Sequence, residues 1–348
     1  MKIGILGAGR IAIKMAETIK GLEKPENMER AIAQMYPDRK AGDTMQPLPQ
    51  VERTAVAARE LERAKKFADE YGFHKAYGSY EELLADPEIE LVYIALPHSH
   101  HCEWTKAALE AGKNVLCEKA FAMNEEEARE MLELAEKKNL LLTEAIWTRY
   151  MPARKMIDDI IERGEIGQVH SLSANLGYPV THKERVMKPE LGGGAMLDLT
   201  VYPLNFASMV FGDKIKGFSA SCIMDKSGVD GQDQVTIAYE DGKAAVLSSS
   251  MYTMTDRTGW IFGDKGMMEV QNINNPEAIR LYECEDGGSP RVTKEYSIPP
   301  QISGYEYEVV SCALALMEGK TECVEMPHSE TIEIMRQMDE IRKSWKAF

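Results

Sequence analysis

The chain opens with a short apolar strand that leads directly into the pattern Gly-x-Gly-x-x-Ala. Residues 2–6 form the strand pattern, and Gly7, Gly9 and Ala12 follow at the spacing of a dinucleotide-binding turn. Gly7 can adopt the backbone angles of the turn, Gly9 lets the main chain approach a pyrophosphate, and Ala12 lets helix and strand pack together. The N–H groups of the helix start attract phosphate. This order predicts a β-α-β unit that binds a dinucleotide, the alternative being a glycine-rich turn without a ligand.

Strand and helix patterns alternate through the first third of the chain. Such alternation indicates a doubly wound parallel sheet, with ligands bound beyond the carboxyl ends of its strands. The expected strands are residues 51–58, 89–96, 114–117 and 140–144, and the expected helices are 11–22, 61–71, 103–111 and 125–138. A polar stretch with four prolines, residues 22–50, delays the second strand. Because a helix-to-strand connection lies at the end of the sheet opposite the cofactor, we expect this insertion to be a surface flap or a subunit contact.

Beyond residue 150 the pattern changes to consecutive strands. Several are separated by turns such as Asp241-Gly242 and Asp286-Gly287, and two helices, 305–318 and 329–345, follow. At 348 residues the chain is long enough for two domains. We therefore predict an α/β protein with a Rossmann domain over residues 1–122. Residues 123–348 are expected to form an α+β domain on a large, open, mainly antiparallel sheet.

Composition argues against several classes of partner. The formal net charge of −15 is unsuited to nucleic acid and to anionic membrane surfaces. No apolar run approaches the roughly 20 residues of a membrane span, and the first residues belong to a strand rather than to a signal peptide. The six cysteines are scattered without a Cys-x-x-Cys pair, which favours reduced thiols. We expect a cytoplasmic protein that acts on a small molecule.

Two further segments carry candidate catalytic side chains. Glu118 and Lys119 directly follow a short strand, at the sheet edge where the cofactor must lie, and a lysine there can hydrogen-bond ribose or substrate hydroxyls. Residues 192–194 are glycines that free the backbone at a helix start, and Asp198 and Tyr202 then share one helical face. A phenol beside a lysine cation can exchange a proton with a substrate oxygen. The structural alternatives are a solvated Glu–Lys pair, a helix-terminal carboxylate and a half-buried tyrosine.

Together, the three segments resemble the Gfo/Idh/MocA family of NAD(P)-dependent oxidoreductases. The marks of that family are an N-terminal Rossmann fingerprint, a Glu-Lys-Pro turn and an Asp-x-x-x-Tyr or Asp-x-x-x-His helix. The runs 75–83, 115–119 and 144–149 are similar to those of the dimeric dihydrodiol dehydrogenases and bacterial xylose dehydrogenases within it. The resemblance covers most of residues 51–211, and it implies a homodimer or a higher homo-oligomer.

The resemblance implies a role for each matching residue. Lys119 matches a lysine that contacts the nicotinamide ribose and the substrate and assists proton transfer. Tyr202 matches the acid/base, and Asp198 matches the carboxylate that orients the substrate hydroxyl. Ala120 stands where the family has proline, so we expect a looser turn around Lys119.

The nicotinamide side of the cofactor site is also implied by the resemblance. Pro97, His98 and His101 fall on a turn that lines it, with His98 in place of the usual asparagine, and Trp147 and Arg149 match a strand-end pair that closes over it. The full set of expected cofactor-binding residues is Gly7, Gly9, Arg10, Ile11, Arg59, Pro97, His98, His101, Glu118, Lys119, Trp147 and Arg149.

The end of the second strand favours NADP over NAD. An NAD site needs an acid there for the ribose 2′-OH, whereas this chain has Arg59 first and Glu60 after it. A guanidinium can hold a 2′-phosphate with two hydrogen bonds, and a carboxylate repels it. No metal is expected, because the histidines at 98, 100 and 101 offer at most two converging ligands.

The residues thus predict an NADP-dependent oxidoreductase. It would transfer a hydride between nicotinamide and a secondary hydroxyl or carbonyl of a sugar or cyclic diol. Two alternatives remain open from the sequence. One is an enzyme of the same fold that cleaves glycosides through transient oxidation and regenerates its cofactor. The other is a non-catalytic regulator that senses dinucleotides, although a sensor has no need of Lys119, Asp198 and Tyr202.

Overall fold

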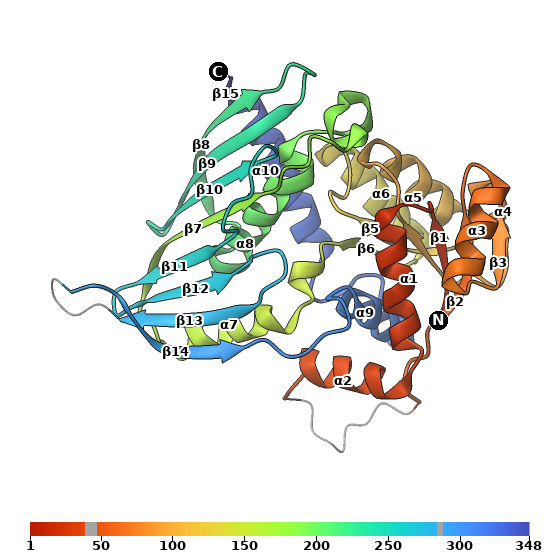
Figure 1. Ribbon diagram of the computed structural model, residues 1–348, viewed down its shortest axis with the longest axis horizontal. Coiled ribbons are helices and arrows are strands. Elements are labelled where there is room, and N and C mark those ends of the chain that lie inside the picture. Colours follow the sequence, from red (N-terminus) through yellow and green to blue (C-terminus); the bar gives the residue numbers. More distant parts are fainter. Residues whose placement is uncertain (39–46, 284–287, 348) are drawn as a thin grey trace. The chain divides into compact units, whose positions relative to one another are not determined.

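The computed structural model describes residues 1–38, 47–283 and 288–347 (Figure 1). Internal contacts divide the chain into two units, Met1–Tyr150 with Pro300–Ile332 and Met151–Pro299 with Glu333–Phe348. This division differs from the expected ranges 1–122 and 123–348. The first unit extends to Tyr150 because the strand that ends at Ala145 pairs with the Rossmann sheet, and it also recruits a segment from near the end of the chain.

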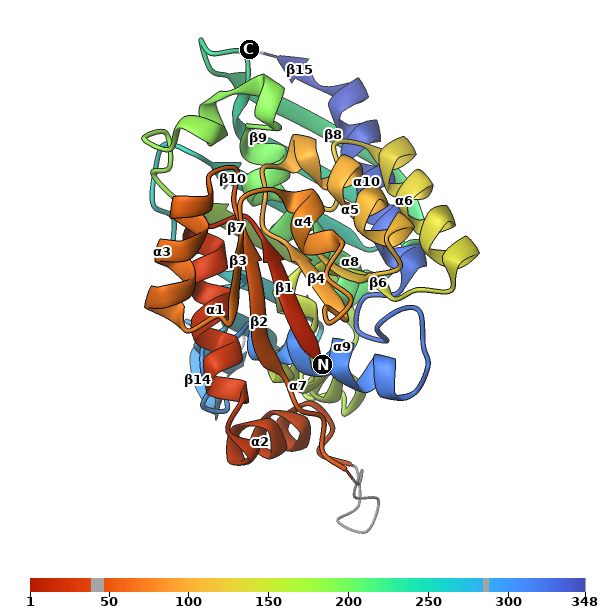
Figure 2. The same cartoon turned by 90° about the vertical axis from the view of Figure 1, so that its right-hand side faces the viewer.

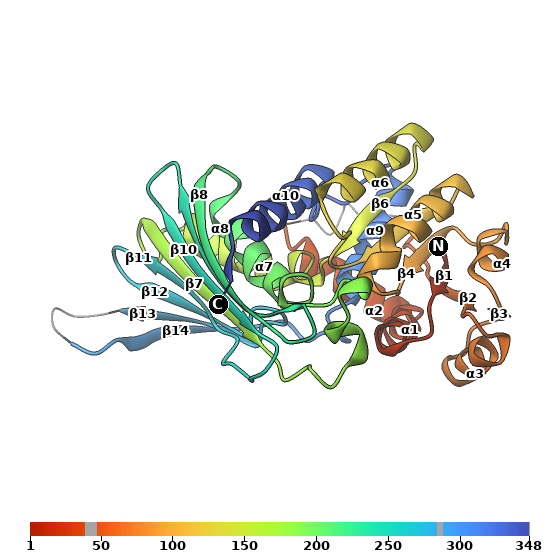
Figure 3. The same ribbon diagram turned by 90° about the horizontal axis from the view of Figure 1, so that it is seen from above.

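The first unit is built on a six-stranded parallel sheet in the order β3-β2-β1-β4-β5-β6, as the alternating pattern predicted. Helices α1 and α3 lie on one face and α5 and α6 on the other (Figures 2 and 3). The strands are β1 (Lys2–Leu6), β2 (Glu52–Ala57), β3 (Lys75–Tyr77), β4 (Leu91–Ile94), β5 (Asn114–Glu118) and β6 (Leu142–Ala145). The α-helices are α1 (Arg10–Leu22), α2 (Pro25–Met35), α3 (Leu61–Tyr71), α4 (Tyr80–Leu84), α5 (His101–Glu110), α6 (Glu125–Lys138) and α9 (Glu306–Met317).

Part of the insertion 22–50 is helix α2. Pro25 starts the helix, where its missing N–H is harmless, and Met28, Ala31 and Met35 are buried. The helix packs against α1 and α9, and Gln34 accepts a hydrogen bond from the hydroxyl of Tyr307 on α9 (2.9 Å). The insertion therefore joins the Rossmann sheet to the returning segment. Residues 39–46 of the insertion lie outside the described residues.

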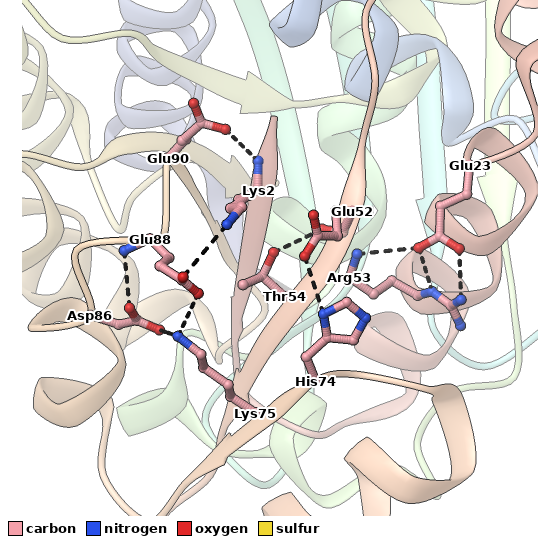
Figure 4. A network of polar contacts seen from close by, with 10 residues as sticks. All are labelled: Lys2, Glu23, Glu52, Arg53, Thr54, His74, Lys75, Asp86, Glu88 and Glu90. Atoms are coloured by element: carbon pink, nitrogen blue, oxygen red, sulfur yellow. Dashed lines mark hydrogen bonds and ion pairs between the residues drawn. The ribbon is translucent and has the colours of Figure 1, made fainter.

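The amino-terminal edge of the parallel sheet is covered by charges that pair with one another (Figure 4). Arg53, at the start of β2, donates to both carboxylate oxygens of Glu23 (2.8 and 2.7 Å). Lys75, at the start of β3, bridges Asp86 and Glu88 (2.9 and 2.7 Å). The charged side chains at this edge are therefore paired with one another within the first unit.

The second unit is built on a second sheet. Its described residues form nine strands in the order β14-β13-β12-β11-β7-β10-β9-β8-β15. Pairing is antiparallel except for β7 with β10 and β8 with β15, so the expected mainly antiparallel sheet is confirmed. The strands are β7 (Val169–Gly177), β8 (Ile215–Met224), β9 (Asp230–Tyr239), β10 (Ala244–Ser250), β11 (Gly259–Gly263), β12 (Met267–Gln271), β13 (Ala278–Glu283), β14 (Arg291–Ser297) and β15 (Lys346–Ala347). The α-helices are α7 (Pro152–Glu162), α8 (Val201–Phe211) and α10 (His328–Ser344), the last of which begins in the first unit.

The sheet of the second unit has one covered face. Helices α7, α8 and α10 lie against it (Figure 3), and along β9 the side chains of Val235, Ile237 and Tyr239 are buried while those between them are exposed. This two-residue period is that of a half-buried strand.

The Asp241-Gly242 turn joins β9 to β10, with Gly242 at φ +87°, and the Asp286-Gly287 turn lies outside the described residues.

Candidate active site

The first unit brings most of the expected cofactor-binding residues to one edge of its sheet. Parallel strands end at a common edge, and residues that follow five of the six strands were selected from the sequence: Gly7 and Gly9 after β1, Arg59 after β2, Pro97, His98 and His101 after β4, Glu118 and Lys119 at the end of β5, and Trp147 and Arg149 after β6. The strand order reverses between β1 and β4, where ligands of such sheets bind. These residues thus lie at the edge of the sheet opposite the paired charges of Figure 4.

The glycine turn has the geometry of a phosphate site. Gly7 has φ +104°, and a Cβ there would lie 2.6 Å from the carbonyl oxygen of Ala95. A Cβ on Gly9 would meet nothing within 4 Å. Gly9 precedes α1 without a side-chain cap among the described residues, and the first turn of α1 carries no acid. Arg10 and Ile11 begin this helix, so its uncapped N–H groups are available to an anion.

Two arginines lie beside this turn. Arg59 is exposed directly after β2, and Glu60 is the residue that precedes α3. Arg63, in the first turn of α3, donates to the carbonyl oxygen of Ala8 in the glycine turn (3.0 Å). Arg63 was missed by the sequence reasoning, which considered only the residues directly after β2; Arg63 lies in the first turn of α3. The positive charges of both arginines lower the pKa of Tyr80, which burial raises more strongly.

The turn after β4 contains two buried histidines, one of which contacts the main chain with both ring nitrogens. His98 and His101 are both buried, and their rings meet edge to face at 5.6 Å. The two ring nitrogens of His101 contact the carbonyl oxygens of Leu96 (3.0 Å) and Ala120 (2.9 Å). Burial lowers the pKa of His101 to about 4. At that pKa the ring is neutral at pH 7 and donates from one nitrogen only, and by its two main-chain contacts His101 joins the β4 turn to the turn that follows β5.

Two hydrogen bonds to the carboxylate of Glu118 stabilise the Glu118–Lys119 turn. The hydroxyl of Tyr93 donates to one carboxylate oxygen of Glu118, and the Lys119 N–H donates to the other (3.2 Å). Ala120, which replaces the family proline, is fully buried, and the Lys119–Ala120 peptide bond is cis. Lys119 itself is half-buried. The carboxylate of Glu118 therefore positions the main chain of Lys119.

The residues after β6 contact the returning segment. The Trp147 ring stacks on Tyr305 with centroids 4.1 Å apart and planes 8° from parallel. Arg149 donates to Glu330 (3.0 Å), and both Trp147 and Arg149 are 7% exposed. These contacts bind the end of β6 to residues 300–332 within the same unit.

Two buried carboxyl groups near this edge were not expected. Within residues 1–38, 47–283 and 288–347, both oxygens of Glu144 on β6 and both oxygens of Glu308 on α9 are buried without a hydrogen-bond partner. Burial raises the pKa of Glu144 to about 7, against the lowering effect of the Arg149 charge. Burial raises the pKa of Glu308 well above its usual value, and the Glu118 charge adds to the effect. Sequence alone gives no sign of these groups, since their burial depends on the pairing of β5 with β6 and on the return of α9.

In the second unit, Asp198 lies on a π-helical stretch, Met196–Thr200, and not on the α-helix that the spacing suggested. Such stretches often occur at functional sites. Arg185 donates a hydrogen bond to the carboxylate of Asp198 (2.8 Å), and Asp198 is 6% exposed. Tyr202 is half-buried in the first turn of α8. The three glycines end at Gly194 with φ +110°, directly ahead of this stretch.

Comparison with known proteins extends these observations. Residues 1–146 match the family described as an oxidoreductase family with an NAD-binding Rossmann fold, and residues 155–269 match the GFO/IDH/MocA C-terminal domain. The chain is 35% identical over 297 residues to trans-1,2-dihydrobenzene-1,2-diol dehydrogenase of Xenopus laevis, covering 84% of this chain and 90% of that protein. The human enzyme of that name is 34% identical over 305 residues, with 86% and 91% covered.

Solved structures share the fold. A 3-ketoreductase from Actinomadura kijaniata with bound NADP and TDP-benzene has a TM-score of 0.84 at 23% identity, with 100% of this chain and 98% of that chain covered. An aldose-aldose oxidoreductase from Caulobacter crescentus has a TM-score of 0.79 at 19% identity, with 99% and 97% covered. At these identities the likeness concerns the fold alone.

Fold, sheet edge and relatives define a class: an oxidoreductase with an NAD(P)-binding Rossmann fold that acts on CH–OH groups. The chain belongs to the Gfo/Idh/MocA family. Among its described residues, no helix is both long and apolar enough to span a membrane.

Proposed function

We propose that this protein is an NADP-dependent dehydrogenase that transfers a hydride between nicotinamide and a secondary hydroxyl or carbonyl of a sugar or cyclic diol. One observation carries the proposal: an uncapped helix start behind an open glycine position, with two arginines beside it, on the carboxyl edge of a parallel sheet. The names of the curated relatives support a diol or sugar as the substrate class.

The residues present fit NADP. Gly7, Gly9 and the start of α1 would hold the pyrophosphate, and Arg59 with Arg63 would hold the 2′-phosphate. The remaining proposed contacts are those of Arg10, Ile11, Pro97, His98, Glu118, Lys119, Trp147 and Arg149, with His101 acting through the main chain of its neighbours. When bound, the nicotinamide supplies the group that accepts or donates the hydride.

Three side chains are proposed to serve the substrate hydroxyl. Tyr202 takes its proton as the carbon is oxidised, and the cation of Lys119 favours the phenolate form that makes this possible. Asp198 orients the hydroxyl and is itself oriented by Arg185 (2.8 Å). These roles rest on the family resemblance and on the chemistry of the residues.

We further propose a homodimer or higher homo-oligomer that works in the cytoplasm. The uncovered face of the nine-stranded sheet offers a contact surface, with Val246 55% exposed on β10. The scattered cysteines support a reducing compartment, and none of the described cysteines forms a disulfide.

The test is a reduction screen with Tyr202→Phe as its central variant. Wild-type protein is mixed with NADP and with aldoses, inositols, glycosides or cyclic diols, and NADPH is followed at 340 nm while products are identified. Tyr202→Phe should lose turnover and keep its affinity for NADPH, because only the proton acceptor is removed. Undiminished turnover would remove Tyr202 from the reaction. Glycoside cleavage without net NADPH would replace the proposed reaction, and dinucleotide binding without any product would indicate a sensor.

A further inference from the structure

Strand β9 begins with two buried carboxyl groups that none of the roles above uses. Asp230 is 7% exposed and Asp233 is fully buried. A buried carboxylate is unfavourable unless it is paired or hydrogen-bonded, so both need partners within the second unit. Their partners lie on the segment that carries Asp198.

A β-bulge brings the two carboxyl groups to the same face of the strand. Residues three apart on a regular strand point to opposite faces. Here Ile223 of β8 pairs with Gln232 and Met224 pairs with Asp230, which leaves Gly231 as an extra residue. A Cβ on Gly231 would lie 2.1 Å from the hydroxyl of Tyr252, so glycine is needed there. The extra residue reverses the alternation and aligns Asp230 with Asp233.

Each carboxyl group contacts one end of the π-helical stretch Met196–Thr200. Asp230 accepts a hydrogen bond from the N–H of Met196 (2.5 Å), the first residue of the stretch. Asp233 accepts one from the hydroxyl of Thr200 (2.6 Å), the last residue. Asp198 lies midway between these two contacts. The stretch is therefore attached to the sheet at both ends of the residue that is proposed to orient the substrate.

The charges around the pair favour a single shared proton. Burial raises the pKa of Asp230 to about 6 and that of Asp233 well above its usual value, with the charge of Asp230 as the next cause for Asp233. Arg342 on α10 lowers both pKa values, while Cys222 on β8 and Tyr252 beyond β10 also face the pair. The charge of Asp230 favours the protonated form of Asp233, whose second oxygen, Oδ1, is buried without a hydrogen-bond partner among the described residues. Asp230 keeps its negative charge for the Met196 N–H.

We propose that Asp230 and Asp233 are positioning residues for the reaction proposed above. They fix both ends of Met196–Thr200 and thereby set the orientation of Asp198 and the position of Tyr202, which follows this stretch at the start of α8. This inference rests on the proposed function. Neither aspartate is a catalytic residue in this scheme, since each acts through the main chain or side chain of the stretch.

The first test compares two replacements of Asp233. Asp233→Asn keeps an oxygen that can accept from Thr200 and gains an amide that can donate to Asp230, so kcat should stay within a few-fold of wild type. Asp233→Leu removes the acceptor for Thr200 and the protonated carboxyl beside Asp230 at similar volume, so kcat should fall on the order of 100-fold, as expected for a misplaced reacting group, with the Kd of NADPH unchanged. Thr200→Val removes one donor only and should lower kcat by about tenfold. Thr236→Val makes the same change at an exposed site on β9 and should alter nothing.

The second measurement is amide hydrogen exchange in residues 194–202 of the protein without cofactor. Asp233→Leu and Thr200→Val should accelerate exchange in this segment, while Asp233→Asn should not. The inference is overturned if Asp233→Leu keeps its kcat, if exchange in the segment is unchanged, or if kcat falls only in proportion to the folded fraction. If the wild-type protein turns over none of the substrates, the proposed function fails, and exchange still decides whether the two aspartates hold the segment.

Discussion

The chain has two glycine-rich turns that precede a helical segment, and the two use glycine for opposite purposes. At the first, a Cβ on Gly9 would enter open space, and no described side chain caps the start of α1. At the second, a Cβ on Gly193 would lie 2.4 Å from the carbonyl oxygen of Val186, and one on Gly194 would lie 2.1 Å from Asp230. The first turn leaves room beside free N–H groups, whereas the second is packed against the protein's own carboxylate.

The difference shows how similar sequence patterns can serve a ligand or the fold. A helix start needs an acceptor for its first N–H groups. In the second unit Asp230 is that acceptor, through its bond to Met196, so no outside anion is required. In the first unit the acceptor has to come from a ligand or from water, as a phosphate site requires.

The largest expected effect is at the packed turn. Gly194→Ala combines φ +110° with an overlap against a buried, hydrogen-bonded carboxylate, and it should destabilise the fold by about 3 kcal/mol or more. Urea unfolding measures this change. Gly212→Ala is the matched control, since Gly212 also has positive φ (+73°) but open space around its Cβ, and it should lose about 1 kcal/mol. Equal losses for the two variants would contradict the tight packing.

The next largest effect is the pH dependence of stability that Glu144 gives the first unit. Neither buried oxygen of Glu144 has a hydrogen-bond partner in the part of the chain that the structure describes, whereas Asp230 and Asp233 each accept one hydrogen bond. The pKa of Glu144 is raised to about 7 by burial, so the native state keeps a proton that the unfolded state releases above its ordinary pKa of 4.5. The free energy of unfolding is highest below pH 4.5, where Glu144 is protonated in both states. It falls by about 3 kcal/mol as the pH rises through 4.5 to about 7.

Glu144→Gln should remove this slope. Unfolding free energies at pH 5 and pH 8 measure it, with Glu62→Gln on exposed α3 as a control that should keep the wild-type slope. If stability depends on pH equally in wild type and Glu144→Gln, the pKa of Glu144 is not raised in the native state.

A smaller effect concerns the ligand that the open turn receives. Arg59→Ala should weaken NADPH binding by roughly 10- to 100-fold, the range of a hydrogen bond to a charged group, and leave NADH nearly unchanged. Calorimetric titration with both cofactors measures it. Lys65→Ala removes a positive charge elsewhere on α3 and should affect neither cofactor strongly. An equal loss for NADPH and NADH would exclude the 2′-phosphate assignment.

The smallest change in the fold is expected at the open glycine itself. Gly9→Ala places a methyl group in empty space at φ −97°, so unfolding should change by less than about 0.5 kcal/mol. Dinucleotide affinity should fall about tenfold, because the main chain no longer approaches the pyrophosphate closely. Unchanged affinity would place the phosphates away from Gly9.

The sequence predicted those features that depend on local pattern. The opening strand and Gly7, the parallel sheet and the mainly antiparallel sheet follow from periodicity and turn residues, and all are present. Contacts across long separations had no such signal. Arg63 on the glycine turn, Asp230 beneath Met196 and Glu308 beside Glu118 depend on how distant segments meet. The π-helical stretch was missed because its spacing resembles that of an α-helix over a single turn.

The returning segment also bears on how the protein is made. Helix α9 is buried along most of its length within the first unit, against α1 and α2. During synthesis the Rossmann sheet emerges about 150 residues before this helix does, so the surface that α9 covers stays open until residues 151–299 have been made. Contacts of such long sequence separation slow folding and expose intermediates to aggregation. We therefore expect that a fragment ending at residue 150 would depend on chaperones, and that the nearly complete chain is the smallest piece able to finish its own nucleotide-binding unit.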